Sequence, residues 1–331
     1  MAFNPYALMR QLARIKSARL RLLGAWVCSV TQQRYFGLFL DPVLACNLRC
    51  QMCYFSDEAQ RERLRGRLSM DELHAIAEVF FSRAIKLQIG CGAEPTLFTS
   101  LPKLVALGKQ YRVPYISITT NGQLLSADLL KRLVDAGLDE VTLSLHGLTQ
   151  QTYEELMQGA SFEQFEQTIA ILAQATKQSP HLRIRINYTM NAKNIEELSL
   201  LPALLERLPA TVVQLRPVQK LGDTAWTDFS LDNLRASYSE LLPTLTETLA
   251  AKGITLLYPS LEDINDWDKS PTPAQQALQD LTYCNIDPHT PQPMMLPRLD
   301  ISRLWHSLMG VPYKSEEQKK GLTKKMAYHI Q

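Results

Sequence analysis

The stretch Cys46-Asn47-Leu48-Arg49-Cys50-Gln51-Met52-Cys53-Tyr54-Phe55 decides how the rest of this sequence is interpreted. Its three cysteines have C-x3-C-x2-C spacing and follow the apolar, strand-like run 35–44. Three thiolates on one short loop can bind a common centre, but so short a loop cannot easily supply a fourth ligand. A protein that holds a metal with three ligands usually keeps the remaining position for chemistry. The stretch therefore predicts a metal centre on Cys46, Cys50 and Cys53 with an open coordination position.

Strand-like runs alternate with helical runs from residue 35 onward. Six strands are expected, over residues 35–44, 84–89, 115–119, 140–145, 182–189 and 211–215, with helical segments between them. Repeated strand–helix units predict a parallel sheet with right-handed crossovers. We therefore expect an α/β fold, a partial (β/α)6 TIM-like barrel. Residues 1–34 are expected to form a basic amphipathic helix and lead-in, 35–225 the barrel, and 226–331 a helical and irregular, proline-rich extension.

Residues suited to binding or catalysis gather where these strands end. In barrels and open α/β sheets the site lies at the carboxyl ends of the strands. The three cysteines belong to this set, and its other members are Glu94, Asn121, Ser144, His146, Asn187 and Arg216. We therefore expect these side chains to share one site.

Composition excludes several classes of protein. The net charge of +2 predicts no general affinity for nucleic acid, and we expect no nucleic-acid partner. No apolar run approaches the ~18 residues of a membrane-spanning helix. Six cysteines in 331 residues, three of them clustered, do not resemble a secreted disulfide framework. These features predict a cytoplasmic protein.

The N-terminal segment is basic, and its first acidic residue is Asp41. Residues 7–23 are expected to form a helix, with Leu8, Leu12, Ile15 and Leu22 on one face and Arg10, Arg14 and Arg21 on the other. Arg19 interrupts the apolar face. A basic amphipathic helix can lie on an anionic membrane surface, resembles a transit peptide in composition, or simply packs on the outside of a domain. Peripheral membrane contact through residues 7–23 is therefore one of three open interpretations.

The cysteine stretch resembles the signature of the radical S-adenosylmethionine (SAM) enzymes, and other motifs agree with it. Gly92-Ala93-Glu94-Pro95 is similar to the family's Gly-Gly-Glu-Pro motif, which receives the methionine amino group. Thr119-Thr120-Asn121-Gly122 is similar to a common family variant, and Ser144 stands where the family often contacts SAM. Asn187 and Arg216 match by position only. The resemblance covers about residues 35–225.

The resemblance implies a [4Fe-4S] cluster on Cys46, Cys50 and Cys53. It also implies that SAM is held against the open iron by Gly92, Glu94, Asn121, Ser144, Asn187 and Arg216. A flavodoxin- or ferredoxin-like protein would supply one electron. SAM would then be cleaved reductively, and a hydrogen atom would be taken from a substrate. That substrate is either a peptide or protein, or a lipid or small metabolite.

The sequence departs from the family pattern in its extension and leaves one alternative open. Many members carry a cysteine-rich SPASM or twitch extension for auxiliary clusters, whereas here only Cys284 follows Cys91. We therefore expect a single cluster. The alternative is a non-catalytic iron–sulfur or zinc protein that binds a partner, with zinc completed by Cys91, Cys284 or a histidine. Cys91, His146 and Cys284 are expected to be structural.

Overall fold

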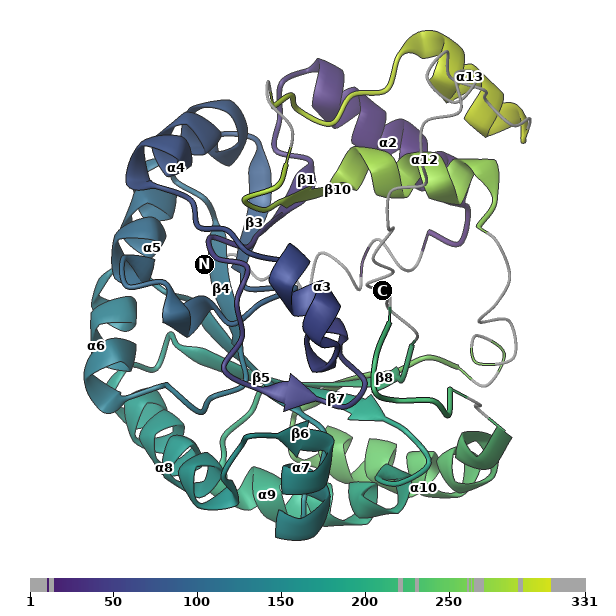
Figure 1. Ribbon diagram of the computed structural model, residues 1–331. Coiled ribbons are helices and arrows are strands. Elements are labelled where there is room, and N and C mark those ends of the chain that lie inside the picture. The colour runs from purple at the N-terminus through teal and green to yellow at the C-terminus, as the bar shows by residue number, and fades with distance from the viewer. Residues whose placement is uncertain are drawn as a thin grey trace.

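The centre of the protein is an eight-stranded sheet in which every neighbouring pair of strands is parallel. The computed structural model describes residues 11, 15–219, 223–229, 232–260, 262, 264, 271–290 and 294–310. The spatial order of the strands is β10-β1-β3-β4-β5-β7-β8-β9. The strands are β1 (Phe36–Leu40), β3 (Ala84–Ile89), β4 (Tyr115–Thr120), β5 (Glu140–Leu145), β7 (Arg183–Met190), β8 (Val212–Pro217), β9 (Thr255–Leu257) and β10 (Tyr283–Ile286). The sheet curves into an open, partial barrel (Figure 1), which confirms the expected fold class.

Helices cover the outer face of the sheet (Figure 1). They are α4 (Met70–Ile76), which continues into a π-helical turn η2 (Ala77–Phe81), α5 (Leu101–Gln110), α6 (Ala127–Asp135), α8 (Phe162–Gln178), α9 (Leu201–Arg207), preceded by the 3-10 helix η4 (Ile195–Leu200), and α10 (Asp232–Ala251). Ser69 and Glu72 exchange hydrogen bonds in a capping box at the start of α4. Gly137, which follows α6, has φ +101°, which favours glycine.

The two faces of the sheet differ in polarity. Side chains on the outer face, such as Leu87, Ile118 and Leu143, are fully buried beneath the helices. The inner face is polar: Gln88 Nε2 donates to Thr119 Oγ1 at 2.8 Å. Other inner residues include Lys86, Ser117, Glu140, Thr142 and Arg185. A parallel strand buried on both faces is usually apolar throughout, so the polar lining indicates an interior built for binding.

The N-terminal helix differs from the prediction. Residues 15–17 are not helical, and α2 spans Ala18–Val30. Ser17 caps it, with its Oγ accepting from Leu20 N at 3.4 Å. A continuous helix over residues 7–23 is therefore wrong, since the cap at Ser17 begins a new helix. Residues 7–10 and 12–14 lie outside the described residues.

The C-terminal extension contributes more to the sheet than its irregular sequence suggests. It contains α10, β9, α12 (Pro273–Thr282), β10 and α13 (Ile301–Met309). Pro273 stands in the first turn of α12, where proline is favoured, and Thr272 forms a capping box with Gln275. β10 then pairs with β1, and the Phe39 and Tyr283 rings stack 4.1 Å apart. None of the helices in the described ranges is long and apolar enough to cross a membrane.

Candidate active site

The cysteine loop leaves β1 and is held by a separate part of the chain. Cys50 lies in the short strand β2 (Arg49–Cys50), which pairs antiparallel with β6 (Met157–Gln158), directly after α7 (Gln150–Leu156). Cys53 N donates to Cys50 O at 2.9 Å, and the 3-10 turn η1 (Tyr54–Ser56) follows. The helix α3 (Glu58–Arg63) then covers the loop. The loop conformation is therefore fixed by backbone pairing, and the thiols of Cys46, Cys50 and Cys53 remain free.

Burial makes these three thiols poor thiolates on their own. It raises the pKa of Cys46 to about 12 and holds the pKa values of Cys50 and Cys53 above the usual range. The other two cysteines raise the pKa of Cys50 further, so the three sulfurs lie close enough to repel one another as anions. A bound cationic centre removes this penalty, because metal ligation requires the thiolate and releases its proton. The loop therefore suits a positively charged metal centre.

Glu94 is the most buried carboxylate of the site, at 3% exposed. It follows β3 and begins the 3-10 turn η3 (Pro95–Leu97). Its Oε1 accepts from Thr96 Oγ1 and Thr120 Oγ1, each at 2.7 Å, and its Oε2 accepts from Asn121 N at 2.9 Å. Burial raises the pKa of Glu94, while these donors lower it. A carboxylate fixed in this way in a water-poor site can form a strong, charge-assisted bond to an ammonium group.

Asn121 connects the third strand end to the cysteine loop. Its Nδ2 donates to Asn47 Oδ1 at 2.9 Å and lies 3.8 Å from Cys46 Sγ. Gly122 has φ +80°, and a Cβ there would lie 2.8 Å from Leu143 Cδ1, so the turn requires glycine. The structure therefore brings Cys46, Glu94 and Asn121 together as predicted.

Asp41 belongs to this region although it lies outside the motifs that resemble the family. It stands just after β1, and its carboxylate accepts from Cys91 N at 2.8 Å, Gly92 N at 3.0 Å and Ala93 N at 3.3 Å. Burial raises its pKa to about 6, against the lowering effect of these three bonds. The signal in the sequence was an acidic residue directly after an apolar strand. Asp41 therefore anchors the loop that carries Gly92 and Glu94.

Replacing Asp41 with alanine should lower the free energy of unfolding at pH 7 by about 3 kcal/mol, because three backbone N–H groups lose their acceptor. Urea unfolding followed by circular dichroism measures this. The pKa of Asp41 is raised on folding from 3.8 to about 6, so the additional stability that comes from protonating this carboxyl group is greatest below pH 3.8 and is lost as the pH rises through 6. Asp41→Asn should lack this pH dependence. An unchanged pH profile in Asp41→Asn would contradict the assignment.

Ser144, Asn187 and Arg216 lie on the adjacent strands β5, β7 and β8. Ser144 and Asn187 are partners in the β5–β7 register, and Arg216 pairs with Thr189, two residues beyond Asn187. The three side chains therefore project from the same, inner face of the sheet. Asn187 Oδ1 accepts from Arg185 Nε at 2.9 Å. The structure places the three residues on one face as expected, and their contacts with a cofactor remain a prediction.

The remaining polar residues of interest are buried. Burial lowers the pKa of His146 to about 4, so its ring is neutral at pH 7. Cys91 Sγ lies 3.8 Å from Gln88 O, and burial raises its pKa well above the usual range. Burial also raises the pKa of Cys284 on β10 to about 12. These three side chains are therefore neutral at pH 7, which agrees with the structural roles expected for them.

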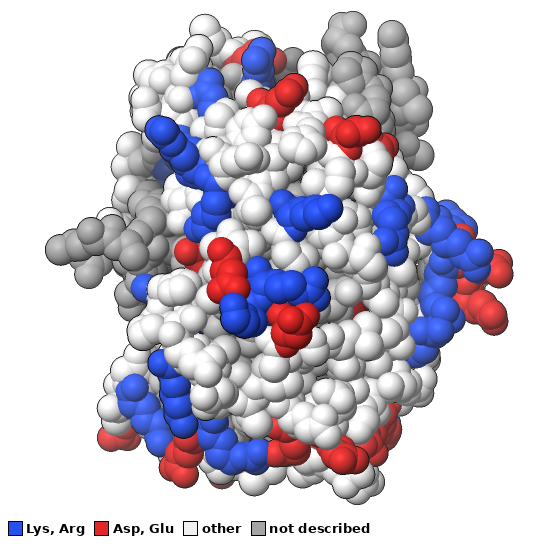
Figure 2. Space-filling model, turned by 90° about the vertical axis from the view of Figure 1, so that its left-hand side faces the viewer, with Lys and Arg blue, Asp and Glu red and all other residues white. Residues whose placement is uncertain are grey.

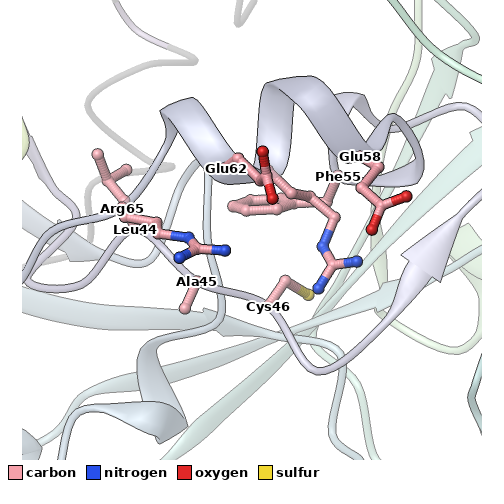
Figure 3. Close-up of a pocket in the computed structure, with 8 residues that line it drawn as sticks. Leu44, Ala45, Cys46, Phe55, Glu58, Glu62 and Arg65 are labelled. Carbon is pink, nitrogen blue, oxygen red and sulfur yellow. The ribbon is translucent and has the colours of Figure 1, made fainter.

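A cavity of about 160 Å³ lies between the cysteine loop and α3. Its lining residues are Leu44, Ala45, Cys46, Phe55, Glu58, Arg61, Glu62 and Arg65. Figure 3 shows Cys46 on the loop beneath α3, with Phe55, Glu58 and Glu62 above it. Cys46 is the one cysteine of the three that borders this space. Cys46 therefore has a polar, charged border.

A family model described as the radical SAM superfamily matches residues 41–198, a segment that contains the three cysteines, Glu94 and Asn121. The chain carries a radical SAM domain over these residues. Superfamily members are enzymes whose cofactors are a [4Fe-4S] cluster and SAM. The motif resemblance is thereby confirmed at the level of the superfamily.

Curated relatives match part of this radical SAM protein. A protein of Sulfolobus acidocaldarius named "Probable GTP 3′,8-cyclase" is 32% identical over 154 residues, which are 45% of each chain. One of Methanococcus maripaludis with the same name is 36% identical over 141 residues, 42% of this chain and 45% of the relative. The match thus spans less than half the length of these relatives.

Solved structures share the fold. Streptococcus suis SuiB bound to S-adenosylmethionine has a TM-score of 0.61 at 15% identity, covering 87% of this chain and 64% of SuiB. The native structure of anSMEcpe with bound AdoMet has a TM-score of 0.54 at 17% identity, covering 67% of this chain and 64% of that one. At these identities the likeness concerns the fold.

The residues present fit the superfamily's cofactors. Among the described residues, no three histidine, cysteine or carboxylate side chains are arranged around a single metal ion. A [4Fe-4S] cluster makes a different demand, because each cysteine binds a different iron. The three mutually repelling thiols suit such a cluster, and the buried carboxylate of Glu94 suits the amino group of SAM.

Proposed function

We propose that this protein cleaves SAM reductively at a single [4Fe-4S] cluster and abstracts a hydrogen atom from a substrate. When bound, the cluster and SAM supply a 5′-deoxyadenosyl radical. The observation that carries the assignment is the hydrogen-bonded network joining Cys46, Asn121 and Glu94. This network supports the proposal, because a purely structural metal site would not need a buried carboxylate held close to one of its cysteines.

The chain's own residues perform binding, orientation and exclusion of water. Cys46, Cys50 and Cys53 hold the cluster, Glu94 binds the amino group of SAM, and Asn121 joins the turn after β4 to the cluster loop. The SAM-binding surface extends along the inner face of the sheet through Ser144, Asn187 and Arg216. Gly92 has no side chain and so allows the backbone to approach SAM closely. Asp41 keeps the Glu94 loop in place. The loops that follow β1, β3 and β4 therefore act together as one preorganised support.

The substrate is proposed as a class, either a peptide or protein, or a lipid or small metabolite. The matches to the relatives named "Probable GTP 3′,8-cyclase" cover less than half of this chain and of each relative, so their named reaction is not transferred to this chain. The polar inner face, with Lys86, Glu140 and Arg185, favours a substrate with polar groups. We propose three units, which are residues 1–34, 35–225 and 226–331. The third unit supplies β10, which extends the sheet of the second.

Anaerobic reconstitution tests the function. The reconstituted protein should bind about four irons, as the cluster requires, show a broad visible absorption that bleaches on reduction, and release 5′-deoxyadenosine from SAM. The alternative, a non-catalytic iron–sulfur or zinc protein that binds a partner, predicts metal without cleavage. If the cluster is reduced and 5′-deoxyadenosine never forms, the enzymatic proposal fails.

We further propose that an acidic flavodoxin- or ferredoxin-like protein delivers the electron over α3. Arg63 and Arg65 are exposed at the end of this helix, and Arg65 borders the cavity beside Cys46. Replacing both with glutamate should slow cluster reduction about tenfold, because electrostatic steering is lost. Stopped-flow reduction at low salt measures this, and dithionite reduction should be unaffected. The matched control reverses Lys131 and Arg132 on α6 and should reduce at the wild-type rate.

A further inference from the structure

The exposed apolar side chains of the protein are concentrated in one corner. Thirteen large apolar residues of the described chain are exposed by more than a third, and nine of them fall within residues 15–30 and 295–309. These nine are Ile15, Leu20, Leu23, Val27, Val30, Met295, Ile301, Trp305 and Met309. Scattered exposed apolar residues need no explanation, but a contiguous patch marks an interaction surface.

The exposed residues of α2 form a stripe along one face. Leu20, Leu23, Val27 and Val30 recur at three- and four-residue intervals, so they lie above one another on the helix. Their exposed fractions run from 41% to 62%. Leu22, on another face, is fully buried. α2 therefore packs on the protein through one face and leaves a second apolar face uncovered.

α13 carries a second stripe with the same character. Ile301, Trp305 and Met309 stand one turn apart and are 73%, 62% and 56% exposed. Leu304 and Ser307 form the buried face. A tryptophan exposed to this extent on an amphipathic helix is typical of surfaces that contact the membrane interface.

The two helices lie side by side and run in opposite directions. Trp26 Nε1 in α2 donates to Leu299 O, just before α13, at 3.0 Å. At the other end, a Cβ on Gly310 would lie 3.3 Å from Arg19 Nη2. Figure 1 shows α2, α12 and α13 as one group beside β1 and β10. The start of α2 and the end of α13 therefore meet at one corner.

Basic residues are concentrated at the two ends of the sequence, which contain or follow α2 and α13. Residues 1–34 contain six basic and no acidic residues, and residues 311–331 contain five lysines and two glutamates. They carry +6 and +3, so residues 35–310 carry −7 in a chain of net +2. By contrast, the side of the barrel seen in Figure 2 shows acidic and basic side chains interspersed.

We infer that the uncovered faces of α2 and α13 dock on an anionic lipid membrane surface. The apolar stripes enter the boundary between headgroups and acyl chains, and the basic segments on either side attract the negative headgroups. This surface differs from the one predicted over residues 7–23, because Leu22 is buried and α13 adds a second exposed apolar stripe. It goes beyond the proposed catalysis and does not depend on it.

Vesicle sedimentation of the cluster-loaded, full-length protein tests the surface. Wild type should pellet with vesicles of phosphatidylcholine and phosphatidylglycerol, and not with phosphatidylcholine alone, and added salt should weaken the binding. The triple variant Ile301→Ser, Trp305→Ser, Met309→Ser should bind at least tenfold more weakly. The control variant Val79→Ser, Leu200→Ser removes exposed apolar residues elsewhere and should bind like wild type.

A second measurement guards against a variant that fails to fold. Brominated lipid should quench wild-type tryptophan fluorescence, and Trp305→Phe should lose most of this quenching while binding normally. Failure of wild type to bind anionic vesicles would overturn the inference, as would equal binding to neutral ones. A concentration-dependent dimer that the triple variant abolishes would instead assign the face to a second copy of the chain. SAM cleavage without vesicles should be unchanged in the triple variant, so the two proposals fail separately.

Discussion

Cys50→Ala is expected to lose both the cluster and SAM cleavage. Cys50 is the middle ligand, held in β2 by pairing with Met157, and its neighbours Cys46 and Cys53 cannot replace its bond to iron. Even loss of a residue that only orients a ligand costs roughly 10–100-fold in metal affinity or activity. We therefore expect the loss of a ligand to exceed that range, with 5′-deoxyadenosine at background.

Iron analysis, visible absorption and product chromatography after anaerobic reconstitution measure the effect. Cys28→Ala provides the matched control, because Cys28 lies on α2, outside the cluster loop. It should retain the full iron content and wild-type cleavage. A Cys50→Ala protein with a complete cluster would show that the ligand assignment is wrong.

Glu94→Gln is expected to keep the cluster and bind SAM about 10–100-fold more weakly. A hydrogen bond to a charged group contributes about 1.5–3 kcal/mol, and every 1.4 kcal/mol is a tenfold change in affinity. The glutamine amide would also meet hydrogen-bond donors where its NH2 group needs an acceptor. This is because Thr96, Thr120 and Asn121 all donate to the Glu94 carboxylate. An NH2 group in place of one oxygen would oppose one of these donors.

Titration of the reconstituted protein with SAM, followed calorimetrically, gives the dissociation constant. Glu72→Gln is the control, because Glu72 is a surface carboxylate that caps α4. It should leave SAM affinity unchanged. If Glu94→Gln bound SAM as tightly as wild type with full iron content, Glu94 would not be the acceptor of the amino group.

The site was largely predictable where its residues are local to a strand end. Cys46, Glu94 and Asn121 each follow an apolar strand, and parallel strands bring their carboxyl ends to one edge. Their convergence therefore follows from strand order alone. Asp41 obeys the same rule, but its partners are backbone N–H groups of Cys91, Gly92 and Ala93, which carry no side-chain signal. A backbone-binding carboxylate cannot be distinguished by sequence from a solvated one.

The sequence by itself determined the alternation of strands and helices and the polar strand ends, and it predicts the cluster ligands, because periodicity and short motifs act within a few residues along the chain. The tertiary structure decided the rest. It placed β10 beside β1 although 242 residues separate Leu40 from Tyr283, and it showed that a helix begins at the Ser17 cap, inside the single helix expected over residues 7–23. It also brought the apolar faces of α2 and α13 together. Such features depend on contacts between distant segments, whose burial and pairing are settled only when the chain is folded.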